Sequence, residues 1–150
     1  METKNDFVAG DDYFKESFLP IIFLFLVLIG VNVYVDRIDV DGIQSLDGFK
    51  QYLLTVWAAF GLQVILIVTT FKFQKKLEQL YGHKPNNWYT TAGSIGGVVA
   101  FVVNSGCIRK GSHGVLAKIT LWVLGILGVV SLLTKVIDLV GGTFIYMGAL

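Results

Sequence analysis

The sequence predicts an all-α integral membrane protein built as a four-transmembrane-helix bundle, and three observations lead to this class. The chain is 54% hydrophobic and only 15% charged, whereas soluble domains carry roughly 25% charged residues. A chain of 150 residues cannot bury so many apolar side chains in a water-soluble core, because small domains keep much of their surface exposed. The charges are also clustered, and they leave charge-free runs at residues 18–35, 51–71, 85–108 and 119–134.

Each run approaches the roughly 20 apolar residues that cross the hydrocarbon core of a bilayer. We therefore expect residues 1–150 to form one membrane domain. It would consist of a polar N-terminal segment at 1–17, spans at about 18–35, 51–71, 88–108 and 116–138, and an apolar tail at 139–150.

The first span is expected to begin close to residue 18. Acidic residues outnumber basic ones before it, whereas a cleavable signal peptide begins with basic residues. Ser17 is suited to an N-cap and Pro20 to the first helical turn, where a missing N–H costs nothing. This segment is therefore predicted to remain as a membrane helix.

The second span is predicted to continue into a short basic amphipathic helix. Phe73, Leu77 and Leu80 recur at helical spacing beside several lysines, a pattern suited to an anionic headgroup layer. The candidate headgroup contacts, including two residues that follow the third run, are Lys72, Lys75, Lys76, Arg109 and Lys110.

The third run differs from the others because small residues line one face of it. Alanines and glycines recur four residues apart, which places them on one side of a helix. Small residues let membrane helices approach closely, and an asparagine on the same face can donate a hydrogen bond across the contact. The helix-packing candidates are Ala92, Gly93, Gly96, Gly97, Ala100 and Asn104.

The distribution of lysine and arginine leaves the path of the third run open. If all four runs cross, basic residues are shared almost equally between the two sides, whereas a re-entrant third segment would gather most of them on one side. We nevertheless favour four spans, because non-helical backbone at membrane depth must be buried against protein or water. Four spans place the N- and C-termini together on the cytoplasmic or matrix-equivalent side.

Four polar side chains interrupt the apolar spans and are candidates for function: Gln63, Asn104, Lys135 and Asp138. Ionisable groups inside a membrane are costly, so they are functional candidates by default. However, a count of about 20 residues from Val115 ends at Thr134. This count favours placing Lys135 and Asp138 at the headgroups, where the lysine can snorkel. Gly141 and Gly142 are then expected to end the helix, leaving the tail as a helical extension or an interfacial segment.

No catalytic constellation is evident in the sequence. It contains no G-x-S-x-G, Walker A or C-x-x-C motif. His83 and His113 flank the third run, so four spans would separate them across the membrane and a re-entrant segment would bring them together. We predict no cofactor, no metal site and no enzymatic activity, and the net charge of +1 gives no reason to expect nucleic-acid binding.

These features favour a small non-catalytic protein that acts as an accessory or structural subunit of a larger membrane complex. The alternative is a self-oligomerising pore, channel or transport protein, including a membrane-perturbing effector. The expected partners are the lipid bilayer and other membrane protein subunits, in a hetero- or homo-oligomer.

Overall fold

The computed structural model describes residues 4–38, 42–83 and 86–149 and is all-helical over these ranges. The outermost residues of the predicted N-terminal segment and of the apolar tail lie outside them. The five helices are α1 (Lys4–Asp36), α2 (Leu46–Tyr81), α3 (Asn87–Ile95), α4 (Val98–Lys110) and α5 (Val115–Ala149). The predicted all-α class is thus confirmed for the described part of the chain.

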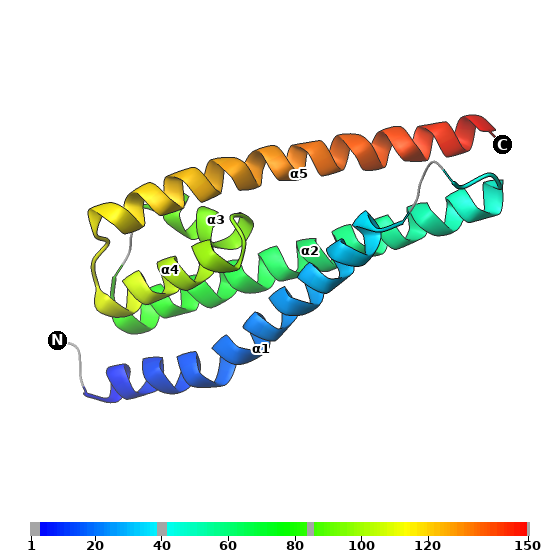
Figure 1. Cartoon of the computed structure of the whole chain (residues 1–150). Helices are drawn as coiled ribbons and strands as arrows, with labels where there is room; N and C mark the ends of the chain where they lie inside the picture. The colour runs from blue at the N-terminus through cyan, green and yellow to red at the C-terminus, as the bar shows by residue number, and fades with distance from the viewer. Residues whose placement is uncertain (1–3, 39–41, 84–85, 150) are drawn as a thin grey trace.

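Three of the helices, α1, α2 and α5, are long and apolar enough to cross a membrane. The third apolar run does not form a fourth helix of this kind, because it is divided into the short helices α3 and α4. Figure 1 shows α3 and α4 between α2 and α5, beside only one half of these long helices. The four-helix bundle expected from the sequence is therefore replaced by three long helices and a short helical pair.

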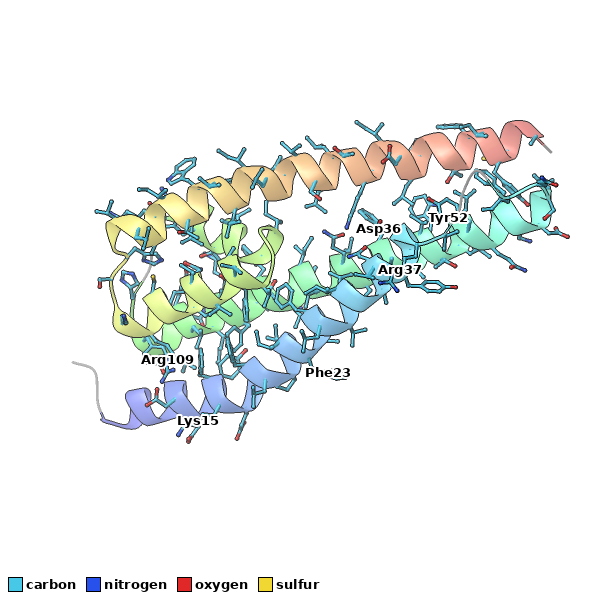
Figure 2. The ribbon with its side chains drawn as sticks, in the orientation of Figure 1. Lys15, Phe23, Asp36, Arg37, Tyr52 and Arg109 are labelled. Atoms are coloured by element: carbon cyan, nitrogen blue, oxygen red, sulfur yellow. The ribbon has the colours of Figure 1, made fainter. Side chains whose placement is uncertain are left out.

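Helix α1 begins well before the first apolar run, so Ser17 and Pro20 lie inside it rather than at its start. An internal proline removes the hydrogen bond to the carbonyl four residues earlier and bends the helix. In Figure 2 the direction of α1 changes between the labelled Lys15 and Phe23. The prediction of a helix start near residue 18 was wrong, because the polar segment before it is also helical.

Helix α2 continues without a break through the basic amphipathic segment. Ser45 accepts a hydrogen bond from the Gly48 N–H at 2.9 Å at its start, and Gly82 ends it in the left-handed conformation. The apolar face of the extension is buried in the protein, with Phe73 1% and Leu77 0% exposed. This face is therefore not available to a headgroup layer, contrary to the prediction.

Helices α3 and α4 form a helical hairpin at residues 87–110, here called the α3–α4 hairpin. The break between them lies at Gly96 and Gly97, and Gly97 has φ 96°, a conformation that favours glycine. The outer ends of the two helices meet, since His83 before α3 and His113 after α4 lie within hydrogen-bond distance. The third run thus returns to the end from which it started.

Small residues allow the hairpin to lie directly against its neighbours. A Cβ added at Gly93 would be 2.0 Å from Oε1 of Gln74 on α2. On α5, a Cβ at Gly128 would be 2.4 Å from the carbonyl oxygen of Ile95. Ala92 and Ala100 are both fully buried. The predicted packing face therefore does contact other helices, except that Gly97 serves the turn.

An aromatic cluster joins α1 to α2 and to the hairpin. Phe101 of α4 lies at its centre, with ring centroids 5.4 Å from Phe73, 5.6 Å from Phe18 and 5.5 Å from Phe25. Aromatic rings at these separations add attraction beyond that of area burial. The cluster thus connects α1 to α4 through Phe101, while the hairpin itself lies between α2 and α5.

Helix α5 does not end at Gly141 and Gly142 but runs to Ala149. Its last turns pack along the beginning of α2, where Trp57 Nε1 donates a hydrogen bond to Thr143 Oγ1 at 3.0 Å. Of the two outcomes considered for the apolar tail, the structure shows the helical extension.

Candidate functional site

Two sets of polar side chains lie between the helices, and the first is a buried network under the α3–α4 hairpin. Gln74 of α2 is fully buried. Its Nε2 donates to the Thr70 carbonyl at 3.0 Å, to the Thr90 carbonyl at 3.3 Å and to Ser94 Oγ at 3.1 Å. Its Oε1 accepts from Nδ2 of Asn104, which is also fully buried. One glutamine thus connects α2 to both helices of the hairpin.

The orientation of the Gln74 amide determines the direction of the hydrogen bonds that lead from it toward the two histidines. Because Asn104 Nδ2 donates to Gln74, Asn104 Oδ1 is an acceptor, and His113 Nε2 at 2.9 Å must donate to it. The neutral His113 ring then accepts at Nδ1, from His83 Nε2 at 3.3 Å. The result is a single directed chain from His83 at the surface to Gln74 in the interior.

The two histidines lie at the outer end of this chain, outside the long apolar helices. The His113 ring stacks on His83 and on Tyr89, with centroid distances of 5.5 and 5.1 Å. Burial lowers the pKa of His113 below its ordinary value of 6.5, and the nearby His83 and Lys118 lower it further. Neutral His113 is therefore the form that the network holds.

A buried acid completes this first set. Glu78 is 3% exposed, accepts from Thr90 Oγ1 at 2.9 Å and forms an ion pair with Lys75 at 3.3 Å. Lys75 also donates to Asn87 Oδ1 at 3.3 Å. Both ends of α3 are consequently tied to α2 by polar contacts, as well as by packing.

The second set surrounds Lys135 of α5. Lys135 Nζ donates to Gln63 Oε1 of α2 at 2.8 Å. Gln63 lies near the middle of the charge-free run 51–71, so the antiparallel packing of α5 on α2 brings Lys135 to that level. The count from Val115 that places Lys135 at the headgroups stays a prediction, because this hydrogen bond shows only which α2 side chain the lysine meets. The side chain turns toward α2 instead of extending away from the bundle.

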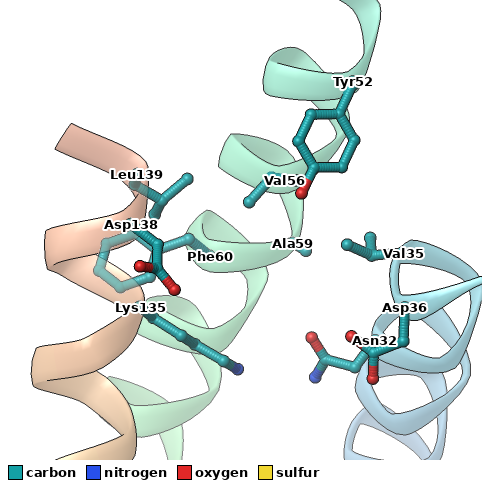
Figure 3. Close-up of a pocket in the computed structure, with 10 residues that line it drawn as sticks. All are labelled: Asn32, Val35, Asp36, Tyr52, Val56, Ala59, Phe60, Lys135, Asp138 and Leu139. Carbon is teal, nitrogen blue, oxygen red and sulfur yellow. The ribbon is translucent and has the colours of Figure 1, made fainter. Parts of the chain in front are cut away.

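Lys135 faces a cavity of about 180 Å³ between α1, α2 and α5, here called the Lys135 cavity. Figure 3 shows Lys135 extending from α5 toward Asn32 and Asp36 of α1. Asp138 and Tyr52 also line this cavity. Within the described residues, no carboxylate lies close enough to Lys135 to form an ion pair. The one hydrogen bond of the ammonium group within the described residues is to the Gln63 amide, and Asp36 attracts it from across the cavity.

The remaining sequence candidates for headgroup contact differ in their surroundings. Lys72, Lys76 and Lys110 are exposed. Arg109 is held to α1, with an ion pair to Asp11 at 3.2 Å and its guanidinium 4.2 Å above the Phe14 ring. Lys75 pairs with Glu78, as described above. Only part of the predicted basic set is thus free to meet a headgroup.

No group of three or more histidine, cysteine, aspartate or glutamate side chains in the described ranges is arranged to hold a metal ion. The single cysteine, Cys107, is half-buried and free. No family model, no curated protein and no solved structure matches the chain. The functional interpretation therefore depends on the geometry of the two polar sets.

Sequence reasoning identified Asn104, Gln63 and Lys135 but missed the residues that join Asn104 to α2. Gln74 and Glu78 stand among lysines in a segment predicted to lie on the membrane surface, where polar residues are ordinary. A signal was present, since Thr70, Gln74 and Glu78 are four residues apart and share one helix face. Their face is next to that of Phe73 and Leu77, which is why they are buried.

Proposed function

We propose that this chain is a small non-catalytic membrane protein that acts as a subunit of a larger membrane complex. In this proposal α1, α2 and α5 cross the bilayer, and the α3–α4 hairpin enters and leaves from the side of His83 and His113. The basic residues of the 72–84 and 109–118 segments then share one side, which the positive-inside rule makes cytoplasmic or matrix-equivalent. Because α1 starts and α5 ends at opposite ends of the molecule (Figure 1), the termini lie on opposite sides, contrary to the sequence prediction.

The observation that carries the proposal is the half-filled space around Lys135. The hairpin fills the region between the long helices only along one half of their length (Figure 1). The Lys135 cavity lies beyond its tip, between the last turn of α1 at Asp36 and residues 52–60 in the first half of α2. A charged group at such depth requires pairing or water. A helix or loop of a partner subunit that enters the cavity would supply what this chain lacks.

Native purification in a mild detergent, followed by mass identification, tests this proposal. The expected result is a stoichiometric membrane partner that is recovered with the wild-type chain and lost with Lys135→Met. Lys76→Met is the matched control, because Lys76 is exposed and lies outside the cavity. Recovery of the wild-type chain alone would contradict the subunit proposal.

The same cavity favours a second candidate, a pore or transport protein formed by self-association. Polar groups from three helices, Asn32, Tyr52 and Lys135, line one cavity, and water entering it would compensate the charge. A homo-oligomer with measurable flux in reconstituted vesicles, reduced in Lys135→Met and unchanged in Lys76→Met, would support this candidate over the first.

A further inference from the structure

A groove of about 400 Å³ runs between α1 and α2, toward the end of these helices opposite to the Lys135 cavity. One part of the groove is lined by polar residues and the other part by apolar residues. The lining residues are Tyr13, Glu16, Ser17, Pro20, Ile21, Leu24, Thr69, Lys72 and Phe73. We call it the Glu16–Lys72 groove, after the two charged residues on its opposite walls.

The two charges of the groove are available to a ligand. Glu16 and Lys72 are both exposed. Neither forms an ion pair with any residue in the described ranges. A carboxylate and an ammonium group on facing walls, too far apart to pair directly, are complementary to a ligand that carries both a positive and a negative charge.

Pro20 adds an acceptor at the same place. A proline inside a helix has no N–H for the carbonyl four residues earlier, and in α1 that carbonyl belongs to Glu16. The bend of α1 between Lys15 and Phe23 (Figure 2) accompanies this break. The Glu16 carbonyl therefore lacks the N–H donor that a residue other than proline would supply at position 20.

The position of the groove matches the boundary of a bilayer. The charge-free run of α1 begins at Phe18 and that of α2 ends at Phe71, so Glu16 and Lys72 lie just outside the apolar zone. Ile21 and Leu24 continue the groove into that zone. A ligand that fits would have a zwitterionic head and an apolar tail.

We propose that the Glu16–Lys72 groove binds one phospholipid whose headgroup ends in a primary ammonium, such as phosphatidylethanolamine. The ammonium donates hydrogen bonds to the Glu16 carboxylate and to the Glu16 carbonyl, and Lys72 contacts the phosphate. One acyl chain follows Ile21 and Leu24. A trimethylated amine carries the same charge but cannot donate these hydrogen bonds, so phosphatidylcholine binds more weakly. This site is independent of the partner proposed above.

Native mass spectrometry of the purified full chain tests the proposal, with phosphatidylethanolamine, phosphatidylcholine and phosphatidylglycerol of identical acyl chains added in turn. Phosphatidylethanolamine is expected to bind about tenfold more tightly than phosphatidylcholine, since a hydrogen bond to a charged group has this effect on affinity. Glu16→Gln should abolish this preference. Lys72→Gln should weaken both lipids and leave their ratio unchanged, because the phosphate is common to them. Pro20→Ala restores an N–H to the Glu16 carbonyl and should reduce the preference in part.

Asp12→Asn and Lys76→Gln are the matched controls, since both residues are exposed on the same two helices and outside the groove. Each should leave the preference at its wild-type value. Any one of four results would overturn the proposal. Two concern affinity: equal binding of the two zwitterionic lipids, or tighter binding of phosphatidylglycerol. The others are the absence of any bound lipid, and an equal loss of the preference in Asp12→Asn and Glu16→Gln. If Glu16→Gln failed to fold, the proposal would still be tested by the preference of the wild-type chain for phosphatidylethanolamine and by the change of that preference in Pro20→Ala.

Discussion

Nε2 of His83 and Nδ1 of His113 lie 3.3 Å apart, although 30 residues separate them in the chain. This contact means that the segment between the two histidines returns to its starting point instead of crossing to the other end of the bundle. Several consequences of this arrangement are open to measurement.

The histidine pair makes the attachment of the hairpin dependent on pH. The folded-state pKa of His113 is lowered from 6.5, so the unfolded chain binds more protons as the pH falls below that value. The stability that neutral His113 contributes to the fold is therefore fully present above about pH 6.5. It declines as the pH falls toward the folded-state pKa of His113. We expect the melting temperature in detergent to fall from pH 7 to pH 5, and hydrogen exchange at residues 104–113 to increase.

His113→Gln is the control for this effect. Glutamine can still donate to Asn104 Oδ1 but does not titrate, so the pH dependence in this range should largely disappear. A melting temperature that rises as the pH falls, in the wild-type chain, would be incompatible with a neutral His113.

The Gln74 and Asn104 amides should behave as one unit. Asn104→Leu leaves Gln74 Oε1 and His113 Nε2 without their partners, and each buried unpaired group costs about 1–3 kcal/mol. Gln74→Leu leaves the Asn104 Nδ2 donor unpaired. The double change removes both amides, so its effect on the free energy of unfolding should be smaller than the sum of the single effects by at least about 1 kcal/mol. Additive effects in denaturant unfolding would show that the two amides are not coupled.

The close packing of α5 on the hairpin should be sensitive to one methyl group at Gly128. Its Cβ would lie 2.4 Å from the Ile95 carbonyl oxygen, so Gly128→Ala must displace backbone. We expect a loss of about 1–3 kcal/mol in the free energy of unfolding. Gly141→Ala is the matched control on the same helix, since a Cβ there meets nothing within 4 Å. It should be neutral or stabilising, and an equal loss in both variants would argue against this packing.

Lys135 should lower the stability of the isolated chain that contains it. Its ammonium group is half-buried and, among the described residues, hydrogen-bonds to Gln63 without forming an ion pair, so replacing it with the apolar Lys135→Met removes a desolvation cost. Thermal unfolding of the isolated chain in detergent should show a gain of about 1 kcal/mol, while Lys76→Met has little effect. Marked destabilisation by Lys135→Met would mean that the lysine stabilises the isolated fold and does not await a partner.

The sequence predicted the all-α class and the apolar runs because these depend on composition and on where the charged residues fall along the chain. The start of α5 at Val115 agrees closely with the span predicted from residue 116, whereas α2 begins at Leu46, before the span predicted from residue 51. The path of the third run could not be predicted in this way. Gly96 and Gly97 are compatible both with a packing face on a continuous helix and with a break between two helices. Which of the two forms depends on contacts with Gln74, which lies on another helix. The level of Lys135 likewise depends on how α5 aligns with α2, and no local pattern contains that register.

The most direct test of the account is the accessibility of a cysteine at position 112, in the turn after α4. In a Cys107→Ser background, Ser112→Cys and Lys76→Cys are labelled in sealed vesicles of known orientation with a reagent that does not cross the membrane. The hairpin arrangement predicts that both positions react from the same side. Reaction of residue 112 only from the opposite side would show that residues 87–110 cross the bilayer and would contradict the account.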